Sequence, residues 1–563
     1  MSIDIETYRL KAQEAIEYVF VKEYHNSLGI PMPIVKMLLP DDANYSTGQY
    51  YITIDKTWQI HLNFGKLPIS YHEFQNEVKV LTRHEIEHYM CCPFDVITHF
   101  RMLKRIRDVY YKHFSHLGIN IEYACGAISN QAADIIVDTK NDYRHSKETL
   151  KSEIDWIKIG ANISACPRHC KLMFLTKEAI WKEDLGINET DPEFLKIVHQ
   201  LADSFTKNGI EDKSSFLDKV EEYAEIFFKL YVEDQKNPQQ SSQQGSQQQN
   251  GQQGSQQQSG QWGVGRPKDG DEHGNAFVFA DPDKVKEAIE VLAEETSVEE
   301  FIDLLAIAGI IGMSDKQKGV LWFNVQSANI IPIVEFSNTG NKSSYTYPSV
   351  WRIGDPIEEL DLMLTYMTSP RLIPGMTTKK WGYVSNDDNG TESKQMDLLL
   401  VVDTSGSMGS AMKESANMHQ AVLASYGILS YFESTKSKVA FIGFSDKIDA
   451  YVDWSDKYDD VRERLLTNGH GGTKFPISRI KSTLDVRSRD LVTVLITNGD
   501  LGNINESVSY FRDYLNDDNK LYIFLLGGSK SLHSYEPLKN IGAKIYNANN
   551  ANEFCDMVLT DME

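Results

Sequence analysis

The hydrophobic positions of this 563-residue chain follow a helical period through most of its first part. Residues 4–28 carry apolar side chains every three or four positions, which predicts an amphipathic helix. Residues 50–64 alternate between apolar and polar side chains, as a half-buried strand does. Another helix is expected to begin at Ser70, a good N-cap residue, and to end before Pro93. Because helical periodicity returns over residues 172–234, the first part of the chain is predicted to be α+β and mostly helical.

From Met396 onward the pattern changes to strands that alternate with helices. Short apolar runs, each followed by an amphipathic stretch, predict strands at residues 398–402, 438–444, 491–497, 521–526 and 543–547. Strands separated by helical patterns are typical of a parallel sheet that is covered on both faces. We therefore expect an α/β doubly wound, Rossmann-like domain at this end of the chain.

Composition separates these two parts. Glutamine, serine and glycine dominate a stretch that cannot bury enough apolar surface to offset its ordering entropy, which predicts a flexible linker. The next region contains a helix with a capping box at Ser297 and Glu300, and strand-like pieces such as 319–325. The predicted organisation is an N-terminal domain, a linker, a bridging region and a C-terminal domain, at residues 1–235, 236–275, 276–395 and 396–563.

The charge of the chain bears on its partners. The formal net charge is −23, from 57 Lys and Arg and 80 Asp and Glu side chains. Nucleic acids and anionic membranes bind basic surfaces, so we expect neither as a partner and favour proteins instead. The first residues lack a secretory signal, no apolar run reaches membrane-spanning length, and the six cysteines are sparse. These features predict a cytoplasmic protein.

The helix expected after Ser70 contains the sequence His-Glu-Ile-Glu-His. His84 and His88 are four residues apart, so both imidazoles project from one helix face with the separation that a tetrahedral zinc ion requires. Glu85 lies beside them, where the glutamate of an H-E-x-x-H site takes a proton from water. The alternative is a surface helix with two incidental histidines. We interpret His84 and His88 as zinc ligands and Glu85 as the catalytic base.

A catalytic zinc ion needs a third protein ligand. Residues 129–138 predict a helix that Ser129 caps, with Asn130, Asp134 and Asp138 on one face. Asp134 is the best-placed third ligand. Asp138, one turn later, is expected to accept the free ring N–H of a ligand histidine and so to orient it.

A second metal centre at Cys166 and Cys170 is the weaker interpretation of those residues. The two thiols flank a histidine, but a matching pair at ligand spacing is missing, since Cys91 and Cys92 are the only other cluster. We therefore expect ordinary thiols.

The strand at 398–402 ends in oxygen-bearing side chains. Asp403, Ser405 and Ser407 stand at alternate positions after it. Ligands bind at the carboxyl ends of strands in α/β sheets, and short oxygen ligands suit a hard divalent cation. An aspartic protease would require glycine at 405 and an all-β setting. A haloacid-dehalogenase-type phosphotransferase would require aspartate there.

These residues resemble the metal-ion-dependent adhesion site of the von Willebrand factor A domain, whose motif is Asp-x-Ser-x-Ser. Two further loops match that family: Gly471-Gly472-Thr473, and the loop after the strand at 491–497. The second loop departs from the pattern, since Asn498 stands at the usual aspartate position and Asp500 follows two residues later.

The resemblance implies which residues hold the ion at this site. The implied ligands of a Mg²⁺ ion, with Mn²⁺ or Ca²⁺ as alternatives, are Asp403, Ser405, Ser407, Thr473 and Asp500. A carboxylate from a protein partner would complete the coordination. Since no nucleophile or general base is present, the site is expected to bind and not to catalyse.

The N-terminal motif resembles the zincin metallopeptidases, in which a strand, an H-E-x-x-H helix and a second helix with an acidic ligand follow one another. Gluzincins commonly carry glutamate as that ligand and aspartate four residues later; here Asp134 and Asp138 take these positions.

The two motifs together resemble bacterial and archaeal proteins that join a metallopeptidase-like domain to a von Willebrand A-like domain and work with a MoxR-type AAA+ ATPase. The resemblance implies a zinc-dependent peptidase whose A domain recruits a partner or substrate. The alternatives are a non-catalytic adaptor or scaffold for such an ATPase and, with less support, a chelatase-like subunit.

Overall fold

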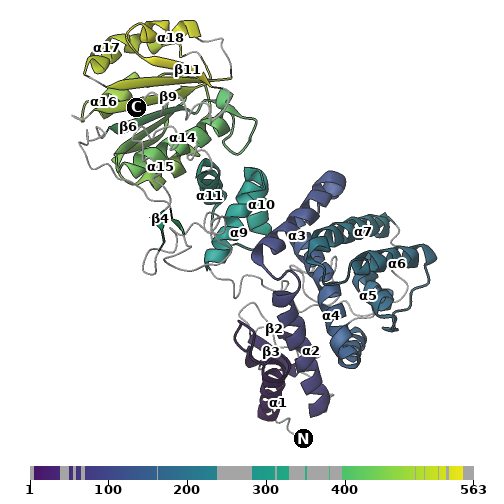
Figure 1. The fold of residues 1–563 in the computed structure, drawn as a ribbon. Helices are drawn as coiled ribbons and strands as arrows, with labels where there is room; N and C mark the ends of the chain where they lie inside the picture. The colour runs from purple at the N-terminus through teal and green to yellow at the C-terminus, as the bar shows by residue number, and fades with distance from the viewer. Residues whose placement is uncertain are drawn as a thin grey trace. The chain divides into compact units, whose positions relative to one another are not determined.

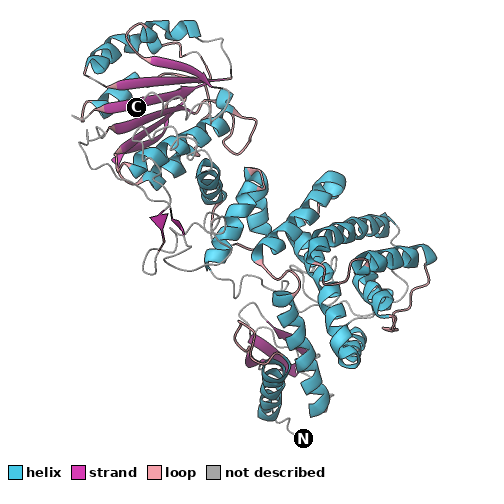
Figure 2. Ribbon diagram, viewed as in Figure 1, coloured by secondary structure: helices cyan, strands magenta, loops and turns pink. Residues whose placement is uncertain are grey.

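The chain forms two compact units, which are described separately. A computed structural model describes residues 5–38, 50–54, 59–64, 70–160, 163–236, 282–310, 313–328, 349–351, 379–380, 396–487, 490–499, 501–517, 519–527 and 532–548. The first unit comprises Met1–Glu295 with Asp303–Gly312, and the second comprises Thr296–Ile302 with Met313–Glu563. The first is mostly helical, whereas the second contains a six-stranded mixed sheet with helices (Figures 1 and 2). None of the described helices is both long and apolar enough to cross a membrane.

The first unit begins with a helix that packs on a small sheet. Helix α1 (Ile5–Glu17) continues as a π-helical turn, Tyr18–Glu23. Strands β1 (Ile34–Leu38), β2 (Tyr50–Ile54) and β3 (Gln59–Phe64) form a sheet in the order β1-β3-β2. The single strand expected over 50–64 is thus two strands, which pair antiparallel. Buried side chains of α1, β1, β3 and the following helix share one core.

Helix α2 (Tyr71–Met90) confirms the predicted start at Ser70. Ser70 Oγ accepts from the Glu73 N–H over 3.3 Å, and Glu73 Oε2 accepts from the Ser70 N–H over 3.2 Å. This reciprocal pair is a capping box. The helix ends at Cys91, two residues before Pro93.

Helix α4 (Ile121–Gly160) is far longer than the helix predicted at 129–138. Ser129 is therefore an interior residue and not the N-cap, so that part of the prediction was wrong. The helix is broken at His145, whose φ of −138° and ψ of 41° are non-helical. Helix α3 (Val96–Val109) precedes it and packs on it.

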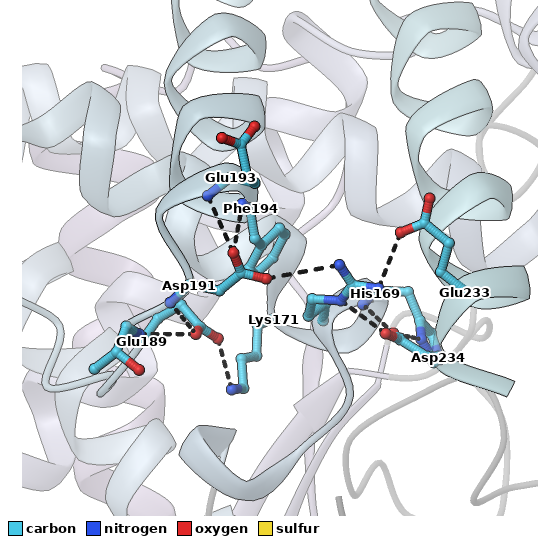
Figure 3. Close-up of polar contacts among 10 residues, drawn as sticks. His169, Lys171, Glu189, Asp191, Glu193, Phe194, Glu233 and Asp234 are labelled. Carbon is cyan, nitrogen blue, oxygen red and sulfur yellow. Dashed lines mark hydrogen bonds and ion pairs between the residues drawn. The ribbon is translucent and has the colours of Figure 1, made fainter. Parts of the chain in front are cut away.

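Three further helices complete the bundle: α5 (Arg168–Trp181), α6 (Pro192–Thr206) and α7 (Phe216–Lys236). A network of polar contacts holds the start of α5 to the end of α7 (Figure 3). Arg168 donates to Asp234 over 2.8 Å and to Glu233 over 3.0 Å. The buried His169 lies 2.8 Å from the other oxygen of Asp234. Asp234 is therefore the acceptor that joins the two helices.

The region after α7 differs in part from its prediction. Nearly all of the linker expected at 236–275 lies outside the described residues. Helices α9 (Pro282–Glu294) and α10 (Val298–Ile307) follow, and both capping-box bonds between Ser297 and Glu300 are present. The strand-like piece at 319–325 was predicted wrongly, because it lies within helix α11 (Asp315–Ala328). Two short strands, β4 (Ser349–Val350) and β5 (Lys379–Lys380), pair antiparallel.

The helical state of residues 319–325 has a tertiary cause. The Trp322 indole donates to the Thr296 carbonyl over 3.0 Å, and the rings of Trp322 and Phe323 pack on His419. Aromatic residues favour strands in isolation, but packing of this kind overrides a weak local preference.

The second unit is organised around a sheet in the order β11-β10-β9-β6-β7-β8. The strands are β6 (Asp397–Asp403), β7 (Val439–Phe444), β8 (Ile448–Ser455), β9 (Leu491–Thr497), β10 (Lys520–Leu526) and β11 (Lys544–Ala548). The helices between them are α14 (Asn417–Ser434), α15 (Tyr458–Leu465), α16 (Ile477–Leu484), α17 (Val508–Asn516) and α18 (Leu532–Lys539). All strand pairs are parallel except β7 with β8. The sheet is therefore mixed, and the wholly parallel sheet of the prediction needs correction at this edge.

Both faces of the sheet are covered. Leu399 and Val401 of β6 lie in a core with residues of α16, α17 and α18. Leu400, which is equally buried, faces the opposite side because side chains alternate along a strand. Helix α14 contacts β6 and is packed with buried side chains. The strand ends that carry the candidate site are thus held in a rigid, two-sided core.

Asp234→Asn is expected to lower the free energy of unfolding of the first unit by about 1–3 kcal/mol, because the amide presents a donor where His169 or Arg168 donates. Glu233→Gln is the matched control. Its carboxylate is 45% exposed, and the change should be below about 1 kcal/mol. Denaturant unfolding of the full chain measures both, and equal effects would contradict the assignment.

The effect of Asp234→Asn should depend on pH. Burial alone would raise the pKa of Asp234, but the hydrogen bonds from His169 and Arg168 outweigh it and lower the pKa below its ordinary value of 3.8. A carboxyl group with a lowered folded-state pKa stabilises the fold above that ordinary value and loses this contribution as the pH falls. The difference between wild type and variant should therefore shrink below about pH 4.

Candidate metal sites

Helices α2 and α4 bring the three predicted zinc ligands together. Asp134 Oδ1 lies 3.5 Å from His84 Nε2 and 3.4 Å from His88 Nε2, and the two Nε2 atoms are 3.1 Å apart. Atoms bound to one zinc ion at about 2.0–2.1 Å and at tetrahedral angles are about 3.3 Å from one another. The spacing of the three donor atoms therefore fits a zinc ion. Among the described residues, His84, His88 and Asp134 form the one group of three His, Cys, Asp or Glu side chains whose donor atoms are this close together.

Hydrogen bonds fix the orientation of each ligand. His88 Nδ1 lies 2.9 Å from the Cys92 carbonyl oxygen, and His84 Nδ1 lies 2.6 Å from Asp138 Oδ1. Because these oxygens only accept hydrogen bonds, each Nδ1 carries a proton, and each Nε2 is the ring atom that faces the site and would bind a metal ion. Asn130 Nδ2 donates to Asp134 Oδ2 over 3.0 Å, which leaves Oδ1 as the atom that faces both imidazoles.

Lys177 of α5 is a member of this site that sequence reasoning missed. Its ammonium lies 2.5 Å from Asp138 Oδ2 and 2.9 Å from Glu153 Oε1. It stands within an apolar stretch of α5, and nothing in the local pattern indicates its partners. A lysine among apolar neighbours on a predicted helix is expected to be buried, and a buried lysine is almost always paired with an acidic group. This pattern could have indicated Lys177.

The charges around the site favour a bound cation. Burial alone would lower the pKa of His84, but the nearby carboxylates, Asp138 foremost, outweigh burial and raise the pKa to about 10. Among the described side chains around the site, the carboxylates of Asp134, Asp138 and Glu153 face the single ammonium of Lys177. A divalent cation would compensate this excess of negative charge. The set of two imidazoles and one carboxylate has the chemistry that zinc prefers.

The two glutamates of the His-Glu-Ile-Glu-His sequence have different surroundings. Glu87 is fully buried and is bound by Tyr24 Oη at 2.9 Å and Lys140 Nζ at 2.9 Å, so it holds α2 to its neighbours. Glu85 is partly buried, and its charge contributes to the raised pKa of His84. Of the two, Glu85 is the one whose carboxylate lies near a ligand imidazole.

Cys166 and Cys170 do not form a metal site with other described residues. Burial raises the pKa of the Cys170 thiol to about 12. A thiol with such a pKa is a weak nucleophile and a weak metal ligand at neutral pH.

The second candidate site lies at the carboxyl end of β6. Asp403 is fully buried; its Oδ1 accepts from the Ser405 N–H over 2.9 Å and its Oδ2 accepts from Thr497 Oγ1 over 2.6 Å. The hydroxyl oxygens of Ser405 and Ser407 are 3.1 Å apart. Sequence-distant strand ends thus deliver several oxygens to one place.

Asn498 directly follows β9 and forms hydrogen bonds with the loop that carries Ser407. Ser407 Oγ donates to Asn498 Oδ1 over 3.1 Å, and Asn498 Nδ2 donates to the Ser407 carbonyl over 2.8 Å. An amide therefore stands where the resembled family has a carboxylate. Asp500, which was predicted to supply the second carboxylate, lies outside the described residues.

The loop that carries Thr473 is held against β6 by backbone contacts. The Gly406 N–H donates to the Gly471 carbonyl over 3.3 Å. A Cβ atom at Gly469 would lie 2.5 Å from the Thr404 carbonyl oxygen and 2.3 Å from Asp449 Oδ2, so this position requires glycine. The loop that carries Thr473 therefore lies against the end of β6, and Gly469, which was not among the predicted residues, allows this close approach.

The donors of this second site suit Mg²⁺. Hydroxyl, amide and carboxylate oxygens are hard ligands, and of the predicted ligands that the structure describes, Asp403 is the one with a carboxylate. Such a set leaves a divalent cation with uncompensated positive charge, which an acidic group from outside could neutralise.

Asn498→Asp is expected to raise the affinity for Mg²⁺ by about tenfold, because it adds a second carboxylate beside Ser407. Asn540→Asp, on an exposed position of the same unit, adds the same charge elsewhere and should leave the affinity unchanged. Isothermal titration with MgCl₂ measures both. Equal affinities for Asn498→Asp and wild type would contradict the placement of the ion at this loop.

Comparison with known proteins does not assign a function to either site. No protein-family model and no curated protein matches the chain. The case for a function therefore rests on the geometry of the two sites and on their motifs.

Proposed function

We propose that this chain is a zinc-dependent peptidase of the zincin type, with a von Willebrand A-like domain that binds an acidic partner or substrate through Mg²⁺. The observation that supports the first part best is the spacing of the Nε2 atoms of His84 and His88 and of Asp134 Oδ1, from 3.1 to 3.5 Å. Three donors that converge on one point, each oriented by a further hydrogen bond, are typical of a metal centre.

The residues around the zinc site would have different roles in hydrolysis. When bound, zinc would supply Lewis acidity toward a peptide carbonyl and toward water. The Glu85 carboxylate would accept the proton of the attacking water and return it to the leaving nitrogen. Asp138 would keep the proton on His84 Nδ1, so that Nε2 remains available as a ligand atom.

The side chains of the second site are suited to binding a cation and, through it, an acidic group of a partner. The site offers hydroxyl oxygens and the carboxylate of Asp403, which is already bound by Ser405 and Thr497. Among the described residues of this site, none is placed as a general base. A carboxylate from a partner protein would supply the missing negative charge.

An adaptor without catalysis is the second candidate, and the binding chemistry of the Asp403 site favours it. In that case zinc would be structural, joining α2 to α4, and the A domain would recruit a partner such as a MoxR-type AAA+ ATPase. The two candidates differ in whether Glu85 performs chemistry.

Glu85→Gln is expected to retain zinc within about threefold and to lower peptide hydrolysis by about 10²–10⁴-fold, because the amide cannot accept a proton. Metal analysis and cleavage of a pool of unstructured peptides by the full chain test this. Glu87→Gln should behave in the opposite way: it removes the charge that Lys140 binds, so stability falls by about 1–3 kcal/mol while turnover by the folded protein persists.

Turnover by Glu85→Gln at the wild-type rate would overturn the peptidase assignment. A wild-type protein that holds zinc but cleaves no peptide would favour the adaptor.

A further inference from the structure

We propose that Lys177 is a positioning residue of the zinc site, which holds Asp138 against His84 and fixes the bend of α4. This inference rests on the proposed zinc site and names a residue that no sequence motif assigns to it. Lys177 does not meet the metal or the substrate; it acts through Asp138.

The ammonium of Lys177, on α5, is buried and binds two carboxylates of α4. Lys177 is 2% exposed, and its Nζ is bound by Asp138 Oδ2 at 2.5 Å and Glu153 Oε1 at 2.9 Å. Burying a lysine without partners is unfavourable by several kcal/mol, so these two carboxylates determine where the side chain lies.

Asp138 transmits this position to the metal ligand. One of its oxygens accepts from His84 and the other from Lys177, so the carboxylate is held at both ends. A carboxylate held this way has one orientation, and it imposes that orientation on the imidazole. Without Lys177, Asp138 Oδ2 would be buried without its charged donor, and the carboxylate would no longer be held in this orientation.

Lys177 also joins the two segments of α4. Asp138 and Glu153 are 15 residues apart, which in a straight helix is about 22 Å, too far for both side chains to reach one nitrogen. The break at His145 lies between them and makes the double contact possible. The segment that carries Asp134 and Asp138 is therefore tied to the segment after the break.

A purely structural role makes different predictions from a positioning role. If Lys177 only joined helices, its replacement would change stability and leave the affinity of folded protein for zinc unaltered. If it positions Asp138, its loss should weaken zinc binding, and the effect should vanish once Asp138 can no longer orient His84.

The experiment measures zinc affinity of the full chain by competition with a chromophoric chelator. Lys177→Met, close in length and uncharged, is expected to bind zinc about 10–100-fold more weakly than wild type. Lys171→Met is the matched control, because Lys171 is another buried lysine of α5, 7% exposed, whose Nζ lies 2.8 Å from Glu189 Oε2; the zinc affinity of this variant should stay within about threefold of wild type. In an Asp138→Asn background, Lys177→Met should change the affinity by less than about twofold.

Two further readouts keep the test decisive. Circular dichroism and thermal unfolding establish that each variant is folded; should Lys177→Met not fold, Lys177→Gln takes its place, with the same direction of change expected. The visible spectrum of the Co²⁺ form reports ligand geometry and should differ between wild type and the Lys177 variant.

The outcomes separate the two proposals. A folded Lys177 variant with wild-type zinc affinity and Co²⁺ spectrum would overturn this inference alone. A tenfold loss that persists in the Asp138→Asn background would also overturn it, since Lys177 would not act through Asp138. Failure of the wild-type protein itself to bind zinc would overturn the proposed function, and this inference with it.

Discussion

The first unit depends on the burial of charged side chains between α2 and α4. Helix packing usually buries apolar surface, but here the contact includes Arg83 with Glu148 at 2.5 Å and Lys140 with Glu87 at 2.9 Å. Breaking one partner of such a pair leaves an uncompensated buried charge, so the pairs fix which residues of the two helices meet. That register places Asp134 and Asp138 opposite His84. These ion pairs therefore help to position the residues of the candidate zinc site.

The second unit also buries a charged side chain, but there backbone and hydroxyl groups donate the hydrogen bonds. Asp403 is buried at the end of β6, and the neutral donors Ser405 and Thr497 satisfy its two oxygens. A carboxylate that neutral donors satisfy keeps its negative charge available to a cation. The rigid two-sided sheet holds these donors in place, which is why the site can be built on loops.

The two sites therefore differ in the chemistry they support. Nitrogen and oxygen donors on α2 and α4, with Glu85 beside them, suit a borderline-soft ion and proton transfer. The oxygen donors near Asp403 suit a hard ion that binds an external anion. The proposed division between bond cleavage in the first unit and recognition in the second rests on this difference in donor sets.

Local sequence was enough to predict the elements with a strong hydrophobic period and the spacing of the motifs. The start of α2 at Ser70, the strand β6 and the placement of His84 and His88 on one face depend on neighbouring residues only, so they could be read directly. Other features became visible only in the folded chain: the helical state of 319–325, the antiparallel β8, the length of α4 and the contacts of Lys177. Each of these depends on residues far apart in the chain, such as Lys177 and Asp138, and long-range packing selects such partners without leaving a local pattern.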